Sequence, residues 1–422
     1  MIQVPESDRA VGMEVYATKT SPCHAKLRTT DSDFGVEEAF GKGAVSDIQG
    51  PGMVPLYRVE KHAVDTLHVA RALAGPLKSR VAYAGMKDKR AVAVQYMTPT
   101  TSKAARPPVV EEDRFTARLV GYLPRPISRS MIAGNRFRIT LRECCSEVSD
   151  CVQQALDNAR SMRLPNFYGH QRFGTKDQVT HRVGKALVQR RFKDAVWALL
   201  CERRSSDDEE ADRARRLLAD GKYDEGSRLL PERQDVERMV ARRLAKGPSE
   251  YVHALRAAPI AVRRLYVQAL QSYLFNRTLS EAVRRGIDIS SVTAGDNWAD
   301  LAKDGLNLGK VHGVREELVE GAVPVVQIPG HAFRNYGSRF DECLQRVLAD
   351  EGIDPRSFFV EEMQEVSAEG GFRRAHLVVS EPSFKVAEDV ATLEFALPRG
   401  GYATVLLREI IKPADPFASG FA

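Results

Sequence analysis

The sequence predicts an α+β fold in which a strand-containing domain is interrupted by a mainly helical region. Strand patterns occupy both ends of the chain, whereas between about residues 179 and 286 the apolar residues recur with helical spacing. The chain has 422 residues, of which 43% are hydrophobic, so it is long enough for two or more domains with buried cores. We therefore expect a sheet domain formed by both ends of the chain and a helical insertion between them.

The first elements surround a glycine turn. Asp65 is placed to cap a short helix that stops at Gly75. A strand pattern follows over residues 81–84, and Gly85 then permits a sharp exit that exposes the next residues. Residues at such a strand end are well placed for chemistry.

The segment 134–142 has the alternation of a half-buried strand. Phe137 lies on its apolar face, and Arg136, Arg138 and Arg142 lie on the other face, which is strongly cationic. That face suits a path for phosphates, and it equally suits an ordinary solvated strand surface.

The remaining helices and strands are predicted from the spacing of apolar residues and from capping residues. Ser206 with Glu209 forms the pattern of a capping box, and Gly247 ends a later helix. Helices are further expected at residues 149–162 and 261–285, and strands at residues 374–380, 392–397 and 402–411.

Composition narrows the class of protein. No apolar run approaches the ~18 residues of a membrane span, and the N-terminus lacks a basic start followed by an apolar stretch, so we expect a soluble, cytoplasmic protein without a membrane partner. The six cysteines show no paired spacing and are expected to be free buried thiols. The nine histidines form no ligand motif, which predicts no metal site. A net charge of +6 is compatible with a polyanionic partner.

The candidate catalytic residue is Asp88. It follows Gly85 and stands among three cations, Lys87, Lys89 and Arg90. These charges favour the ionised carboxylate and lower its pKa, which suits a nucleophile better than a proton donor. A solvated turn whose charges confer only solubility is the alternative reading of the same residues.

The pattern Gly-x-Lys-Asp-x-x-Ala-x-x-x-Gln over residues 85–95 resembles the signature of the TruD family of tRNA pseudouridine synthases. Further blocks resemble the family in the same order along the chain. They are Asp33–Glu38, the spaced residues Tyr57, Lys61 and Thr66, Leu164–Gly174, Gln271–Asn276 and Gly400–Glu409. The resemblance therefore spans nearly the whole chain.

The resemblance implies a catalytic domain with a mixed, largely antiparallel sheet at residues 1–162 and 376–422, and a TruD-specific domain at residues 163–375. It implies an isomerase that converts uridine to pseudouridine, with uridine 13 of tRNA as the main target, without a cofactor. We expect a monomer. Two other functions remain open: a noncatalytic RNA-binding protein that uses the same cleft, and a glycosidase with Asp88 and Glu38 as its acids.

The resemblance also assigns roles to single residues. Asp88 is the essential nucleophile or base. Arg28, where the family commonly has lysine, is placed to pair with Asp88 or to remain solvated. Asn135 would bond the uracil edge, and Phe137 would form an aromatic wall or simply pack in the core. Tyr402 would stack on the target base. The residues expected to contact RNA are Lys87, Lys89, Arg136, Arg138, Gln171 and Arg172.

Overall fold

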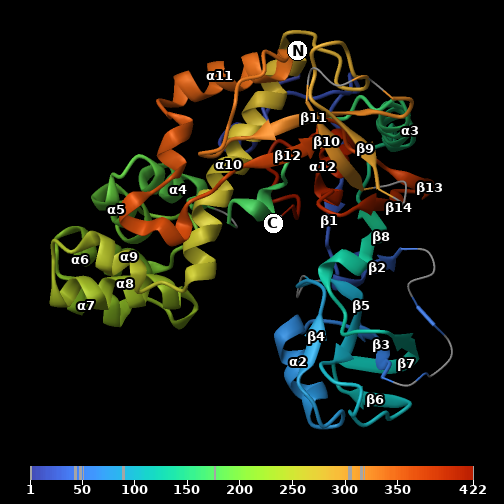
Figure 1. Ribbon diagram of the computed structural model, residues 1–422, viewed down its shortest axis with the longest axis horizontal. Helices are drawn as coiled ribbons and strands as arrows, with labels where there is room; N and C mark the ends of the chain where they lie inside the picture. Colours follow the sequence, from blue (N-terminus) through green and yellow to red (C-terminus); the bar gives the residue numbers. More distant parts are fainter. Residues whose placement is uncertain are drawn as a thin grey trace.

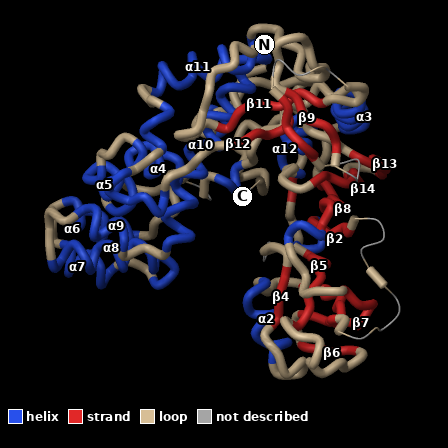
Figure 2. The backbone as a smooth tube through the Cα atoms, viewed as in Figure 1, coloured by secondary structure: helices blue, strands red, loops and turns tan. Residues whose placement is uncertain are grey.

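The computed structural model forms an arch with two arms (Figure 1). It describes residues 2–41, 45–46, 50, 52–87, 91–174, 177–302, 307–313, 317 and 319–421. Helices make up one arm, and the other consists mainly of strands with helix α2 beside them (Figure 2). The two arms meet near the long helix α10 and a second, small sheet.

The strand arm belongs to a ten-stranded sheet, counted over the described residues, in the order β13-β14-β8-β2-β5-β3-β7-β6, with β1 pairing β8 and β4 pairing β5. Only the β2–β5 pairing among these is parallel. The strands are β1 Lys26–Leu27, β2 Phe34–Phe40, β3 Val54–Lys61, β4 Val81–Tyr83, β5 Val92–Pro99, β6 Val109–Glu112, β7 Phe115–Leu123, β8 Ile132–Arg142, β13 Ser380–Ala387 and β14 Val390–Pro398.

A four-stranded antiparallel sheet lies at the top of the arch, in the order β10-β9-β11-β12. Its strands are β9 Trp298–Leu301, β10 Leu308–His312, β11 Val323–Ile328 and β12 Gly371–Arg374. The helices are α1 Glu6–Arg9, α2 Thr66–Ala74, α3 Val148–Arg160, α4 Thr180–Val188, α5 Phe192–Leu200, α6 Glu209–Ala219, α7 Tyr223–Leu229, α8 Asp235–Lys246, α9 Tyr251–Arg256, α10 Ile260–Arg284, α11 Arg339–Glu351 and α12 Ala403–Ile411.

Two large cores hold the arch together. The first lies under one face of β2, β8 and β14, where α3 and α12 cover the sheet, and alternate residues of β8 such as Ile139 and Leu141 point into it. The second is formed by the helices from α4 to α11. Gly134 marks a close approach in the first region, because an added Cβ there would lie 2.1 Å from the carbonyl oxygen of Leu397.

Several predicted elements are confirmed. Asp65 caps α2 by accepting a hydrogen bond from the backbone N–H of His68 at 2.8 Å. The strand predicted at 134–142 lies within β8, the helices predicted at 149–162 and 261–285 are α3 and α10, and residues 392–397 lie within β14. The C-terminal strands join the N-terminal sheet beside β8, whereas the domain boundaries after residues 162 and 375 stay predictions.

Other predictions were wrong. The strand predicted at residues 402–411 is instead helix α12, Ala403–Ile411, because a short run that is buried on every side has no period by which a helix and a strand can be distinguished. Most of 374–380 lies between β12 and β13. Ser206 takes no part in the cap of α6, because Asp208 accepts from the Ala211 backbone N–H and Ser206 donates to Asp177 instead.

The cysteine prediction also needs correction. Cys23 and Cys145 form a disulfide with a Cα–Cα distance of 5.7 Å, although 122 positions separate them in sequence. The pairing of β1 with β8 brings them together, which the spacing alone could not reveal. Of the four free cysteines, Cys144 is partly exposed and the other three are buried. Within the described part of the chain, no helix is long and apolar enough to cross a membrane.

Candidate active site

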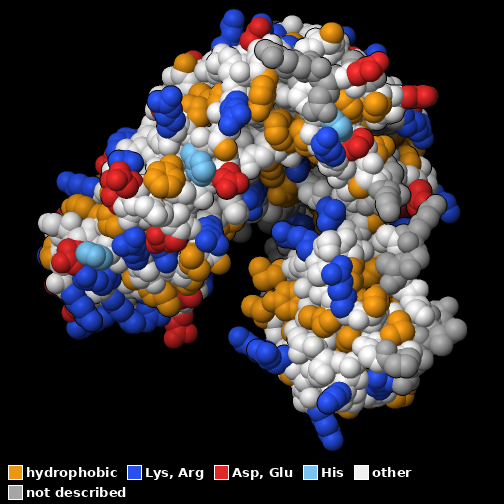
Figure 3. Space-filling view, viewed as in Figure 1, with side chains coloured by type: hydrophobic (Ala, Val, Ile, Leu, Met, Phe, Trp, Pro, Cys, Tyr) orange, Lys and Arg blue, Asp and Glu red, His pale blue; other side chains and the backbone are white. Residues whose placement is uncertain are grey.

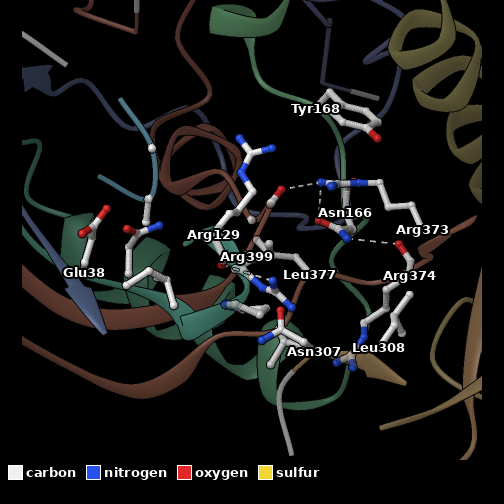
Figure 4. Close-up of a pocket in the computed structure, with 18 of the residues that line it drawn as sticks. Glu38, Arg129, Asn166, Tyr168, Asn307, Leu308, Arg373, Arg374, Leu377 and Arg399 are labelled. Atoms are coloured by element: carbon white, nitrogen blue, oxygen red, sulfur yellow. Dashed lines mark hydrogen bonds between the residues drawn. The ribbon is translucent and has the colours of Figure 1, made fainter. Parts of the chain in front are cut away.

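A cleft of about 570 Å³ opens where the two sheets meet, between the two arms. The space-filling view shows the molecule hollowed between these arms, with Lys and Arg side chains along the hollow (Figure 3). The cleft is lined by the first residues of the loop after β4, the start of β8, the segment around Asn166, strand β12 and the turn after β14 (Figure 4). Segments far apart in sequence therefore share one cavity.

A smaller side pocket of about 250 Å³ adjoins the cleft. The two cavities share Met86, Lys87, Asn135 and Gly401. The side pocket is further lined by residues that include Arg28, Phe137, Gln171 and Tyr402. The four residues predicted to bind the substrate thus lie around one pocket, together with two of those predicted to contact RNA.

The predicted catalytic residue Asp88, and with it Lys89, lies outside the described residues. Lys87, the residue directly before Asp88, lines both cavities. The structure therefore locates the chain immediately before the candidate carboxylate, at the junction of the cleft and the side pocket.

Three buried side chains hold this end of the loop. Thr66 accepts a hydrogen bond from the Lys87 backbone N–H at 3.0 Å and donates one to Gln95 at 2.9 Å. The ammonium of Lys61 lies 2.9 Å from the Val64 carbonyl oxygen and 3.4 Å from that of Lys87. Lys61, Thr66 and Gln95 belong to the family-like pattern, and their contacts show that they position the loop.

Glu38, on strand β2, also holds the loop that carries Lys87. Its carboxylate lies 2.8 Å from the Lys87 ammonium, and its side chain is 1% exposed. The other carboxylate oxygen accepts from the Tyr96 backbone N–H at 2.9 Å. Glu38 is therefore fully engaged within the protein, which fixes the direction of the Lys87 side chain.

On the side of the cleft opposite Glu38, the Arg373 guanidinium contacts two aromatic rings (Figure 4). The Arg373 guanidinium carbon lies 4.1 Å from the Tyr168 ring centre and 5.9 Å from that of Tyr402. Arg373 donates to the Gly400 carbonyl oxygen at 2.8 Å and to the Asn166 side chain at 2.8 Å. It thereby ties β12 to the turn that precedes Tyr402.

Burial shifts the pKa values of Tyr402 and Arg373 in opposite directions. Burial raises the pKa of Tyr402, while the nearby guanidinium groups of Arg373, Arg172 and Arg129 act to lower it. The phenol therefore stays neutral at ordinary pH. Burial lowers the pKa of Arg373, which an arginine tolerates without losing its charge.

Asn135 and Phe137 point from β8 into the site. Within the described part of the chain, the Asn135 side-chain oxygen is buried and has no hydrogen-bond partner. Phe137 stacks on Phe395 at 5.4 Å and is half-buried, so it both packs against the core and lines the side pocket. Such an unpaired acceptor beside an aromatic wall can receive a hydrogen bond from a flat polar ring.

Arg28 lies at the edge of the side pocket. Its guanidinium carbon is 4.2 Å from the Phe34 ring centre, and it donates to the Gly420 carbonyl oxygen at 3.3 Å. The predicted pairing of Arg28 with Asp88 involves a residue outside the described part of the chain, so it stays a prediction.

Arg136 and Arg138 do not share this cleft. They alternate with Asn135 and Phe137 along β8 and so lie on the opposite face of the sheet. On that face, the Arg136 guanidinium lies 3.3 Å from the Glu381 carboxylate, and the Arg138 guanidinium lies 3.6 Å from the Glu394 carboxylate. Contact of these two arginines with RNA would require a second binding surface.

Gln171 and Arg172, both predicted to contact RNA, lie in different surroundings. Gln171 lines the side pocket, where it donates to the Phe421 carbonyl oxygen at 3.1 Å and accepts from Thr404 at 3.3 Å. Arg172 instead donates to Ser272 and Gln268 of α10. Neighbouring His170 is buried between Asp8 and Gln178, which agrees with a packing role.

Sequence reasoning missed Arg129, Arg373 and Arg399, which all line the cleft. No local pattern distinguishes them, because arginine in a loop or at a strand end is common. The only available signal for Arg399 was its place in the turn Pro398–Gly401, directly before the family-like block. Their shared position depends entirely on the tertiary structure.

Comparisons with known proteins find relatives over nearly the whole chain. The family model for tRNA pseudouridine synthase D (TruD) matches residues 10–410. The chain is 35% identical over 430 residues to the "Probable tRNA pseudouridine synthase D" of Pyrobaculum arsenaticum, covering 100% of both chains. It is 31% identical to that of Archaeoglobus fulgidus, covering 96% of this chain and 99% of the relative. A crystal structure assigned to TruD from Methanosarcina mazei is similar with a TM-score of 0.83 at 28% identity, covering 98% of this chain and 99% of the other.

Proposed function

The chain belongs to the tRNA pseudouridine synthase D family, and from that premise we propose that it converts uridine 13 of tRNA to pseudouridine with Asp88 as the essential carboxylate. As an enzyme of this family it is an isomerase. One observation carries the proposal: Arg28, Asn135, Phe137 and Tyr402 come from distant parts of the sequence, yet they line one pocket beside Lys87.

The reaction rearranges bonds without a net change in composition. The bond between N1 of uracil and C1′ of ribose breaks, the base turns, and a new bond joins C5 to C1′. The C5 proton leaves and N1 gains a proton, so no oxidant or reductant is needed. The protein must supply a carboxylate, retain the detached base and hold the RNA.

The residues of the side pocket fit these tasks. Tyr402 stacks on the base of the extruded uridine, a contact that contributes about 1–3 kcal/mol. Asn135 accepts a hydrogen bond from the uracil N3–H, which would satisfy its unpaired oxygen. Phe137 closes the opposite side, and Arg28 is the proposed partner of the Asp88 carboxylate. Asp88 acts at the sugar or the base as nucleophile or base.

The decisive experiment is to incubate the purified protein with unmodified tRNA and to map pseudouridine by position. We expect product at uridine 13 with the unaltered protein and none with Asp88→Asn, while tRNA affinity stays within a few fold because shape and most of the charge survive. Asp194→Asn, in the exposed part of α5, is the matched control and should keep full activity. Turnover by Asp88→Asn would exclude the proposed role of that residue.

The two other functions are tested by the same experiment. If the unaltered protein binds tRNA tightly but forms no pseudouridine, it is a noncatalytic RNA-binding protein. A glycosidase would release free uracil or hydrolyse a sugar substrate. Its second acid would have to be Glu38, whose oxygens are already engaged by Lys87 and by the Tyr96 backbone.

A further inference from the structure

The cleft carries an excess of positive charge that the roles above do not use. Five lysine and arginine side chains line it, and Glu38 is the only acidic residue that lines it within the described part of the chain. Glu38 is already paired with Lys87. The five lysine and arginine residues are Lys87, Arg129, Arg373, Arg374 and Arg399.

Three of these arginines, Arg129, Arg373 and Arg399, form what we call the arginine cluster. Their guanidinium groups lie around the same cavity (Figure 4). Arg399 donates to the Arg129 carbonyl oxygen at 3.3 Å, which holds the two side by side. Among the described residues, none of the three is paired with a carboxylate; the oxygens that Arg373 contacts are three carbonyls and one amide.

An unpaired cluster of like charges is unfavourable in the free protein. Elsewhere on the sheet, the exposed Arg118, Arg136 and Arg138 each have an acidic partner. Guanidinium groups match the paired oxygens of a phosphate with their planar donor geometry. A cleft that concentrates such groups attracts polyanions.

The position of the cluster relative to the side pocket narrows the ligand. The cleft and the side pocket share Asn135 and Gly401, so a nucleotide whose base enters the side pocket would place its backbone in the cleft. The Arg373 guanidinium carbon lies 5.9 Å from the centre of the Tyr402 ring, which is proposed to stack on the base. Arg129 lines the same cleft as Arg373.

We propose that the arginine cluster binds the RNA phosphodiesters that flank the extruded uridine. This inference rests on the proposed function, because it takes the side pocket as the site of the base. The cluster holds the backbone on the side of the cleft away from Glu38, so that the strand is fixed at both the base and its adjoining phosphates. These contacts carry no base specificity and set the register of the RNA.

The test uses Arg129→Gln, Arg399→Gln and the double variant. Both side chains are exposed and neither belongs to a buried core, so these variants should fold. Arg373 is unsuitable for this purpose, because it holds four oxygens of the surrounding chain. Arg346→Gln, an exposed arginine of α11 that does not line the cleft, is the matched loss of one charge.

The dissociation constant for tRNA is measured across a range of salt concentrations. Each lost phosphate contact should lower the slope of log affinity against log salt by about 0.7–0.9, so the double variant should lose about 1.5. Arg346→Gln should leave the slope unchanged. An equal loss of slope in Arg346→Gln and in the cluster variants would refute a localised site.

A chemical probe identifies the phosphates. A tRNA with one neutral methylphosphonate linkage beside the target uridine should bind the unaltered protein several-fold more weakly, and the double variant should show no further loss. If the neutral linkage on either side weakens both proteins by the same factor, the cluster does not contact those phosphates and the inference is wrong. Pseudouridine formation by the unaltered protein, followed in parallel, tests the proposed function separately.

Discussion

The ion pair between Glu38 and Lys87 offers a direct test of how the catalytic loop is held. Removing its negative charge in Glu38→Gln leaves a nearly buried ammonium without a counter-charge, since the Lys87 side chain is 14% exposed. Breaking a buried pair in this way costs about 3–5 kcal/mol. Glutamine keeps one carbonyl oxygen, which can accept from either the Lys87 ammonium or the Tyr96 N–H, while its NH2 group faces the other donor. We therefore expect a loss of at least about 3 kcal/mol.

Glu37→Gln is the matched control. Glu37 neighbours Glu38 on β2 but points to the opposite face, where its side chain is 39% exposed and lies 3.3 Å from Arg58. An exposed pair of this kind contributes no more than about 1 kcal/mol. The two variants therefore make the same chemical change in adjacent residues with very different burial.

Urea unfolding followed by circular dichroism measures both free energies of unfolding. We expect Glu38→Gln to lower the midpoint clearly and Glu37→Gln to leave it nearly unchanged, with similar dependence on urea concentration. Glu38→Gln should also lower pseudouridine formation at a temperature where it remains folded, because Lys87 directly precedes Asp88. Equal free energies of unfolding for the two variants, within about 0.5 kcal/mol, would refute the reasoning.

Three further predictions concern other parts of the molecule. Thr66→Val removes the acceptor for the Lys87 N–H and should slow single-turnover product formation at least tenfold, with Thr66→Ser restoring it; equal rates for Val and Ser would contradict a positioning role. Burial lowers the pKa of His181 to about 4, so the unfolded state takes up the proton first as pH falls below about 6.5; stability should drop by about 2 kcal/mol at pH 5, and urea unfolding of His181→Phe should show a weaker pH dependence. Arg136→Gln tests for RNA on the open face of the sheet: a flatter salt dependence of tRNA binding would support a second surface, and an unchanged slope would exclude Arg136 from RNA contact.

Much of the candidate site could be predicted from local sequence. The glycine turn ends strand β4 and begins the loop that carries Lys87. The tertiary structure decided that the Lys87 side chain is only 14% exposed, because it pairs with Glu38. Helical spacing identified α3 and α10 because their apolar positions repeat over several turns. The family resemblance brought in Asn135 and Tyr402, which no period or cap could have singled out.

The tertiary structure decided which face of β8 meets the cleft. The register pairs Asn135 with Glu38 on one side and with Leu397 on the other. A slip of one residue would turn Asn135 away and bring Arg136 into the cleft, because strand side chains alternate between faces. Alternation alone shows that two faces exist, but it does not show which of them a ligand meets.

Local sequence patterns also failed to predict helix α12 and the three arginines of the cleft. Residues 403–411 are buried on every side, so their helical state was decided by the core that they fill between the sheet and α3. Arg129, Arg373 and Arg399 share a cavity although their local sequences have nothing in common. The sequence by itself determined the turn, the amphipathic helices and the membership of the family, because these depend on neighbouring residues or on matching patterns. The assembly of distant charges and rings was decided by strand register and packing, which act between residues that are far apart along the chain.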